Sequence, residues 1–299
     1  MRIKILATGL SGLVGSRIAE LLGEKFDFQD LAYEKGFDIT KIETVEKEIA
    51  NSPAKILIHL AAFTDVNAAW GQRGDKEGSC YKINVVGTRN ISQLSAKCNK
   101  FLIHFSTDFV FNGKKNESYT EEDKPNPIEW YGQTKCWAEE EVKKSGCQYC
   151  IVRISFPFRA YFLAKIDLVR KIIQGLKNKD LPPMFCDQII TPTFIDDIAE
   201  GVGIILEKQP KGIYHLVGST FFSPYELTQK IADVFGFDKN LVKKGSLKEY
   251  LKNNPNSRPY QKKLALANKK IQKLGIKMKR IDEALIALKE QIIPARFSF

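Results

Sequence analysis

Short apolar runs recur along the first half of the chain, separated by segments whose apolar residues have helical spacing. The runs are RIKILATG, AKILIHLAA, KFLIHFSTDFVF and QYCIVRIS. Between them, the segments GLVGSRIAELLGE, DITKIETVEKEIANS and GSCYKINVVGTRNISQLSAKCN place apolar residues three and four positions apart, which is typical of amphipathic helices. Strands that alternate with helices in this way predict a parallel sheet with helices on both faces.

After Ser155 the alternation becomes less regular. The segment LPPMFCDQIITPTFIDDIAEGVGIILE mixes prolines with a helix start, GIYHLVGS has the pattern of a strand, and SPYELTQKIADVFG that of a serine-capped amphipathic helix. We therefore expect an α/β fold, a Rossmann-type doubly wound parallel sheet with a smaller, partly interleaved C-terminal substrate domain. The expected NAD(P)-binding domain comprises residues 1–155 and about 187–217, and the substrate domain about 156–186 and 218–299.

Composition limits the class of protein. Hydrophobic residues make up 43% and charged residues 27% of the 299 residues, which is typical of soluble globular proteins. No apolar run reaches the roughly 18 residues that a membrane span needs. The N-terminal MRIKILATG leads directly into a glycine-containing turn without a small-residue cleavage site. We expect a cytoplasmic protein without a membrane partner.

The net charge of +11 is unevenly distributed. The segment from Lys239 to Arg280 contains fourteen Lys or Arg and one acid, Glu249. Such a cluster is found in proteins that bind nucleic acid, membranes or phosphate groups, but also on solvated helical faces. Because aromatic residues are sparse in the segment and no nucleic-acid-binding module accompanies it, we predict no nucleic-acid partner.

Cysteine and histidine do not point to a metal or a disulfide framework. Cys147 and Cys150 form a lone CxxC without a second pair, and each of the three histidines lies inside an apolar, strand-like run. These patterns favour structural roles for all of them. We predict no metal site and no serine–histidine triad.

A glycine-rich turn lies between the first strand and the first helix. Glycines let a backbone turn tightly and approach a pyrophosphate at a helix N-terminus. The spacing here is G-x-x-G-x-x-G rather than G-x-G-x-x-G, but the strand–turn–helix context is the required one. We predict that the turn binds a dinucleotide through Gly9, Leu10, Ser11, Gly12, Leu13, Val14 and Gly15.

The expected end of the second strand does not identify the dinucleotide. Tyr33 stands eighteen residues after Gly15, where an acid often holds the ribose of NAD. No basic residue is obviously placed for a 2′-phosphate, although Arg17 is close in sequence. The cofactor is therefore NADP or NAD. Asp38 and Ile39 are candidates for contact with the adenine, and a helix cap explains Asp38 equally well.

The segment WYGQTK contains a candidate catalytic pair. Tyr131 and Lys135 are four residues apart, so on a helix they share one face. A tyrosine has an ordinary pKa near 10, and a nearby ammonium favours phenolate. Thr107, at the polar end of a predicted strand, can hydrogen-bond the substrate oxygen. The same spacing recurs at Tyr161 and Lys165, but that pair lacks a strand-end hydroxyl, so we select Tyr131.

Several motifs in order resemble those of a known family. They are ILIHLAAFTDVNAA, NVVGTRNIS, FSTDFVF, WYGQTK, DQIITPT and SRPYQKKLALANKKIQKLG. Over nearly its whole length the chain resembles the extended short-chain dehydrogenase/reductase superfamily, and within it the dTDP-4-dehydrorhamnose reductase family of nucleotide-sugar reductases.

The resemblance implies roles for individual residues. Tyr131 would protonate the carbonyl oxygen of the substrate, Thr107 would orient that carbonyl, and Lys135 would bind the nicotinamide ribose and lower the tyrosine pKa. Further cofactor-lining residues would be Leu60, Ala61, Ala62, Thr64 and Asn84, the last supporting the lysine through its backbone or a water. The substrate-binding residues would be Thr107, Asp108, Phe109, Phe156 and Arg258.

The chain departs from the family pattern near the expected sugar site. Phe109 and Phe156 stand where tyrosine and tryptophan are usual, which removes a hydroxyl and an indole N–H. Ile190 replaces a usual glycine, and Trp70 an acid often seen there. The two aromatic changes weaken the case for the rhamnose precursor as the substrate, while the expected reductase machinery is retained.

The resemblance implies NAD(P)H-dependent reduction of the 4-keto group of a nucleotide-activated 6-deoxy sugar. One alternative is an epimerase or dehydratase on the same scaffold, which consumes no net cofactor. Another is a non-catalytic NADP-binding subunit similar to the regulatory subunit of methionine adenosyltransferase. The expected partner is a nucleotide sugar, and the resemblance also allows a homodimer.

Overall fold

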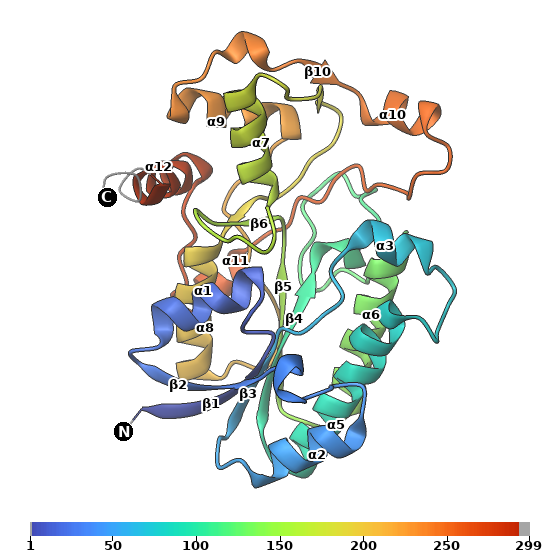
Figure 1. Ribbon diagram of the computed structural model, residues 1–299, viewed down its shortest axis with the longest axis vertical. Coiled ribbons are helices and arrows are strands. Elements are labelled where there is room, and N and C mark those ends of the chain that lie inside the picture. Colours follow the sequence, from blue (N-terminus) through green and yellow to red (C-terminus); the bar gives the residue numbers. More distant parts are fainter. Residues whose placement is uncertain (1, 293–299) are drawn as a thin grey trace.

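The computed structural model describes residues 2–292. Its centre is a six-stranded sheet in the order β2-β1-β3-β4-β5-β9, in which all neighbouring strands are parallel. Figure 1 shows this sheet in the lower half of the molecule. The prediction of a doubly wound parallel sheet is confirmed. The strands are β1 (Ile3–Thr8), β2 (Phe26–Leu31), β3 (Ile56–His59), β4 (Phe101–Thr107), β5 (Tyr149–Ile154) and β9 (Gly212–His215).

Helices cover both faces of the sheet (Figure 1). On one face, Ile18 of helix α1 and Val202 of α8 pack into a core with Ile5 and Ile103 of the strands. On the other face, Val45, Ile91 and Val142 pack in the same way. The helices are α1 (Leu13–Leu22), α8 (Ile195–Lys208) and α11 (Lys269–Gln272) on the first face, and α2 (Ile42–Asn51), α5 (Thr88–Lys97) and α6 (Trp130–Lys144) on the second.

A second group of elements has its own apolar core, in the upper half of Figure 1. The predicted serine-capped helix is α9, in which Ser223 and Glu226 form a reciprocal capping box. Within residues 2–292 no helix is long and apolar enough to cross a membrane. The elements of this group are β6 (Pro157–Phe158), α7 (Leu168–Asn178), β7 (Met184–Phe185), β8 (Thr193–Phe194), α9 (Pro224–Phe235), η4 (Lys239–Leu241), β10 (Lys244–Gly245), α10 (Leu247–Asn253) and α12 (Ile281–Ile292).

Short helical elements connect the strands to the helices. The segment expected as one long helix near residue 80 contains α4 (Ser79–Tyr81), the π-helical segment η2 (Lys82–Gly87) and α5 in direct succession. Such π-helical turns are often found at functional sites. The remaining elements are η1 (Tyr33–Lys35), α3 (Val66–Gly71) and η3 (Asp108–Val110).

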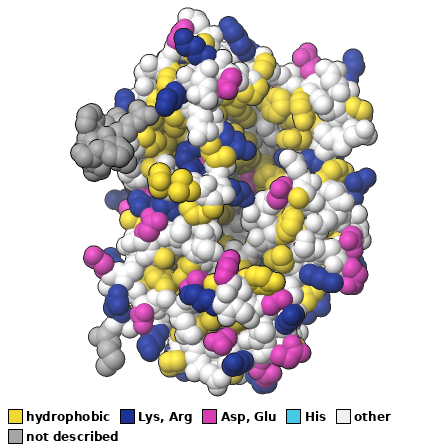
Figure 2. All heavy atoms as spheres, in the orientation of Figure 1, with side chains coloured by type: hydrophobic (Ala, Val, Ile, Leu, Met, Phe, Trp, Pro, Cys, Tyr) yellow, Lys and Arg dark blue, Asp and Glu magenta, His cyan; other side chains and the backbone are white. Residues whose placement is uncertain are grey.

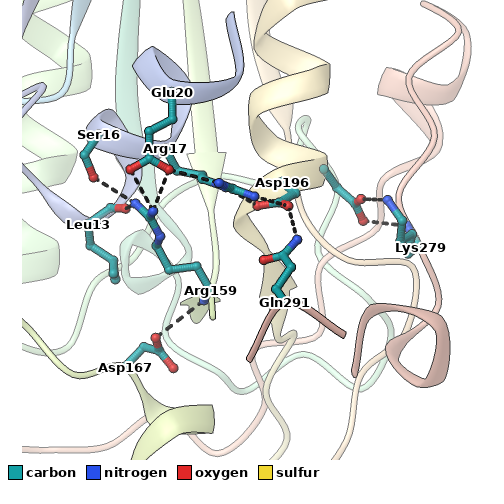
Figure 3. Close-up of polar contacts among 10 residues, drawn as sticks. Leu13, Ser16, Arg17, Glu20, Arg159, Asp167, Asp196, Lys279 and Gln291 are labelled. Atoms are coloured by element: carbon teal, nitrogen blue, oxygen red, sulfur yellow. Dashed lines mark hydrogen bonds and ion pairs between the residues drawn. The ribbon is translucent and has the colours of Figure 1, made fainter. Parts of the chain in front are cut away.

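Charged side chains connect the two groups of elements (Figure 3). Arg159, which follows β6, donates to Ser16 Oγ at 2.9 Å and to both carboxylate oxygens of Glu20 on α1. Within the first group, Arg17 of α1 forms two hydrogen bonds of 2.7 Å with Asp196 of α8. Because its guanidinium is held there, Arg17 points to α8 and does not reach the end of β2.

Candidate active site

The glycine-rich turn packs against the residues that directly follow β3. The order of the strands reverses direction between β1 and β3, which is where open α/β sheets bind ligands. Gly9 has a φ of 75°, and a Cβ built on it would lie 2.6 Å from the backbone nitrogen of Ala61. A Cβ on Gly15 would lie 2.3 Å from the carbonyl oxygen of Gly9. Only glycine fits these two positions, because a Cβ at either one would collide with the protein's own backbone.

Helix α1 begins at Leu13, directly behind this turn. No side chain among the described residues caps its N-terminus, and its first turn contains no acidic residue. The amide groups there are therefore available to an anion, which the positive end of the helix dipole also favours. The residues present fit a dinucleotide pyrophosphate at this place.

Asp38 and Ile39 are held by contacts within the protein. Asp38 Oδ1 accepts from the backbone N–H of Thr40 at 2.9 Å and from its hydroxyl at 2.8 Å. Asp38 thus closes a turn before α2, whose N-cap is Lys41, so it is not the helix cap itself. The carbonyl oxygen of Ile39 accepts from Asn90 Nδ2 of α5 at 3.0 Å.

The loop after β3 contains the expected cofactor-lining residues Ala61, Ala62 and Thr64. Thr64 Oγ1 accepts a hydrogen bond of 2.8 Å from Lys165 Nζ, a contact that sequence analysis missed. Lys165 lies in a segment without helical structure, and the side chain of Tyr161 is 67% exposed. Tyr161 and Lys165 therefore do not share a helix face, whereas Tyr131 and Lys135 both lie on α6.

Asn84, in the π-helical segment η2, connects the β3 loop to α6. Its Oδ1 accepts from the backbone N–H of Phe63 at 2.8 Å, and its Nδ2 donates to Thr134 Oγ1 at 3.0 Å. Thr134 directly precedes Lys135, so Asn84 holds the turn of α6 that carries the lysine.

Thr107, Tyr131 and Lys135 lie together at the end of β4 and the start of α6, and all three are buried. The ammonium of Lys135 donates to the carbonyl oxygen of Phe105 at 2.7 Å. It is therefore directed towards β4. Thr107 favours ionisation of the Tyr131 phenol, and its hydroxyl donates to Asp108 Oδ1 at 3.1 Å.

The net pKa of Tyr131 is raised rather than lowered in this structure. Burial, followed by the negative charge of Glu129, raises the pKa of Tyr131 above its ordinary value, and this outweighs the effect of Thr107. Tyr131 is therefore a phenol at neutral pH. Burial also lowers the pKa of Lys135 to about 8.

Glu129 is a member of the site that sequence analysis missed. It is the N-cap of α6, and its carboxylate accepts from the backbone N–H groups of Tyr131 and Gly132. Burial raises its pKa to about 7. Glutamate is not among the common N-cap residues, so the sequence contained no signal for this contact.

Asp108 is buried beside Thr107 at the same strand end. It accepts from Ser155 Oγ at 2.6 Å and from Thr107 Oγ1 at 3.1 Å. Burial raises the pKa of Asp108 to about 7 in spite of these hydrogen bonds. A carboxyl with this pKa can exist in either protonation state near neutral pH.

The two aromatic residues that depart from the family pattern form one wall of the site. The ring of Phe109 lies 5.8 Å from that of Tyr131 and 6.2 Å from that of Phe156, between centroids. Phe156 has a φ of 39°, an uncommon conformation for a bulky residue and one often found at functional sites. The Arg258 guanidinium lies 3.8 Å from the ring centroid of Tyr260 and 5.7 Å from that of Phe109.

Figure 2 shows a hollow between the two groups of elements, with lysine and arginine side chains in and beside it. The basic side chains suit a phosphate-bearing ligand. Within residues 2–292 no three His, Cys, Asp or Glu side chains are arranged to hold a metal ion.

Known proteins resemble this chain in sequence and in fold. The family model described as RmlD substrate binding domain matches residues 3–292. A dTDP-4-dehydrorhamnose reductase from Aggregatibacter actinomycetemcomitans is 30% identical over 237 residues, which cover 77% of this chain and 78% of that protein. Methionine adenosyltransferase 2 subunit beta from Rattus norvegicus is 26% identical over 247 residues, covering 78% and 72%.

Among solved structures, dTDP-4-dehydrorhamnose reductase from Bacillus anthracis str. Ames in complex with NADP has a TM-score of 0.87 and 28% sequence identity. The match covers 97% of this chain and all of that one. The family match, the parallel sheet and the glycine-rich turn all point to the same family. The chain belongs to the RmlD substrate binding domain family, the dTDP-4-dehydrorhamnose reductase-like group of the extended short-chain dehydrogenase/reductase superfamily.

Proposed function

We propose that this protein is an NAD(P)H-dependent reductase that acts on the 4-keto group of a nucleotide-activated 6-deoxy sugar, with Tyr131 as the proton donor. The observation that carries the proposal is the buried group of Thr107, Tyr131 and Lys135 at the end of β4, in the same sheet whose strand β1 leads into the glycine-rich turn. The raised pKa of Tyr131 keeps the phenol protonated at neutral pH, which is the form that a proton donor needs.

The chain's own residues would hold the dinucleotide. The backbone from Gly9 to Gly15 would bind the pyrophosphate, and the loop from Leu60 to Thr64 would contact the dinucleotide from the end of β3. Lys135 would bind the nicotinamide ribose through an N–H that its bond to Phe105 leaves free. A reduced nicotinamide bound there would supply the hydride.

Separate groups would recognise the two ends of the substrate. The Phe109–Phe156 wall suits the apolar face and methyl group of a deoxy sugar. Arg258, whose guanidinium lies 5.7 Å from the ring centroid of Phe109, would bind the diphosphate. Thr107 and Asp108 would hydrogen-bond the sugar near its carbonyl group. The departures at Phe109 and Phe156 favour a 4-keto sugar other than the rhamnose precursor.

The similarity to a subunit of methionine adenosyltransferase 2 supports a second candidate, a dinucleotide-binding subunit that catalyses nothing itself. Retention of the buried Thr107, Tyr131 and Lys135 favours the reductase over this candidate. An epimerase or dehydratase remains the alternative enzyme, and net cofactor consumption distinguishes it from a reductase.

The test is the loss of NADH or NADPH absorbance with a panel of dTDP- and UDP-linked 4-keto-6-deoxy sugars. We expect consumption by the wild type and its near-complete loss in Tyr131→Phe. Tyr161→Phe is the matched control, because it alters the second Tyr-x-x-x-Lys pattern on an exposed loop. Sugar conversion without cofactor loss would indicate an epimerase or dehydratase. Cofactor binding with no reaction on the panel would contradict the reductase proposal.

A further inference from the structure

The ammonium of Lys135 is buried without a carboxylate partner. The residue is 2% exposed, and it forms no ion pair with the other described residues. Its hydrogen-bond partners are the carbonyl oxygen of Phe105 at 2.7 Å and His104 Nε2 at 3.4 Å. Both partners come from β4 and both are neutral.

His104 is fully buried and has one polar partner. Its Nε2 faces Lys135, whereas its Nδ1 has no hydrogen-bond partner among the described residues. The neighbouring His59 lies opposite His104 in the β3–β4 register, with ring centroids 5.4 Å apart. His59 differs because both of its ring nitrogens are bonded, to Thr8 and Thr88 hydroxyls at 2.7 and 3.1 Å. A buried nitrogen without a hydrogen-bond partner, such as Nδ1 of His104, is unfavourable. The one polar contact of the ring, from Nε2 to Lys135, therefore calls for an explanation.

The tautomer of His104 must follow the charge of Lys135. When the lysine is an ammonium it donates to Nε2, so the ring proton is on Nδ1. When the lysine is a neutral amine, the ring can carry its proton on Nε2 and donate to Nζ. The imidazole itself stays neutral, because burial and then the charge of Lys135 lower its pKa well below the ordinary value.

We propose that His104 is a positioning residue that holds the ammonium of Lys135 in place as a neutral hydrogen-bond acceptor. This inference rests on the proposed function, which gives Lys135 its task. A carboxylate in the same place would also hold the ammonium, but it would cancel the positive charge that the cofactor ribose would experience. A neutral ring orients the lysine and leaves that charge effective.

The other titratable groups around Lys135 are either neutral or already paired, so His104 is the neighbour whose hydrogen bond to Lys135 can be changed by itself. His59 of β3 is kept neutral because burial lowers its pKa to about 3. Burial raises the pKa of the Cys80 thiol of α4, so it is also neutral. Glu139 of α6 is charged, but it is paired with Arg153 through two hydrogen bonds. A substitution at His104 therefore changes the hydrogen bonding of Lys135 without changing a formal charge.

The first measurement is the dissociation constant of NADH, followed by fluorescence between pH 6 and 10. In the wild type, affinity should fall as pH rises through the pKa of Lys135. His104→Leu removes the acceptor and should move this midpoint down by about one pH unit. His104→Gln provides an amide oxygen as an acceptor and should return the midpoint most of the way to the wild-type value. His215→Gln, an equally buried histidine of β9, should leave the midpoint unchanged.

¹⁵N NMR of the histidine-labelled chain tests the same contact without cofactor. The His104 signals are assigned because they are absent from the spectrum of His104→Gln. We expect the Nδ1–H tautomer at pH 7 and a change of tautomer as Lys135 deprotonates. An Nε2–H tautomer throughout, or an unchanged NADH midpoint in a folded His104→Leu, would overturn the inference. A chain that binds no NADH or NADPH but changes tautomer would support the contact while refuting the proposed function.

Discussion

The carboxylate of Glu129 accepts a hydrogen bond of 2.8 Å from the backbone N–H of Tyr131. Glu129, the N-cap of helix α6, thus directly contacts the backbone of Tyr131, the proposed proton donor. A negative charge at the start of the helix stabilises it and, at the same time, opposes ionisation of the tyrosine.

Stability should depend on pH through Glu129 and Asp108. The pKa of each is raised to about 7, so the folded protein retains protons that the unfolded chain releases near pH 4. Their contribution is complete below pH 4 and is lost as pH rises through 7. We expect Tm to decline between pH 5 and 8, and Glu129→Gln or Asp108→Asn to flatten the decline. An equal decline in wild type and both variants would contradict this explanation.

The buried ion pair between Glu139 and Arg153 should be sensitive to removal of one partner. Both side chains are almost fully buried and share two hydrogen bonds of 2.7 and 2.8 Å. Glu139→Leu leaves the guanidinium unpaired and should lower the free energy of unfolding by about 3–5 kcal/mol. The double variant Glu139→Leu/Arg153→Met should recover most of the loss in urea unfolding. A double variant as unstable as the single one would show that burial of the unpaired charge is not the cause.

Gly15 should not tolerate a side chain. Because a Cβ there would lie 2.3 Å from the carbonyl oxygen of Gly9, Gly15→Ala must displace the turn that would bind the pyrophosphate. We expect NADH affinity to fall by roughly five- to 150-fold, as overpacking of about 1–3 kcal/mol implies. Gly71→Ala is the control, since nothing lies within 4 Å of its added Cβ. Equal NADH affinity in both variants would remove the turn from the binding site.

Arg258 should affect substrate binding more than turnover. Its guanidinium is partly buried against Tyr260 and Phe109, and burial lowers its pKa. Arg258→Met keeps an apolar stem but removes the charge, so KM for the nucleotide sugar should rise roughly tenfold or more. Lys252→Met, an exposed residue of the same basic segment, should leave KM unchanged. A fall in kcat at constant KM would place Arg258 outside the diphosphate site.

Arg159 should keep the loop of residues 160–166 ordered. The loop starts at Arg159, which binds Ser16 and Glu20 on α1. Arg159→Met should increase chymotrypsin cleavage after the exposed residues Tyr161 and Leu163. Arg280→Met, at an exposed position, is the control. Unchanged cleavage in Arg159→Met would mean that other contacts hold the loop.

The sheet could be predicted from the sequence because its signals are local. Each central strand is an apolar run of four to seven residues, and each helix has its own apolar face. The Tyr131–Lys135 spacing is equally local, and the structure has this pair on one helix. The direction of the Lys135 ammonium is not local, because it depends on a carbonyl group of β4 thirty residues away.

Contacts between distant segments could not be predicted. Arg159 binds Ser16 across 143 positions, and neither residue belongs to a recognisable motif. One missed relationship did have a signal. The runs ILIH and FLIH each end in histidine, so parallel pairing in register places His59 beside His104.

The π-helical segment η2 sets an angle between two ends of one continuous helix. Relative to an α-helix, a π turn contains an additional residue. Deleting that residue would rotate one end of the helix relative to the other by about 100°, the angle per residue of an α-helix. Asn84 and Thr88 then could not both keep their partners, Thr134 and His59. The extra residue therefore sets the angle between Asn84 and Thr88, so that one continuous helix can contact α6 and β3 at the same time.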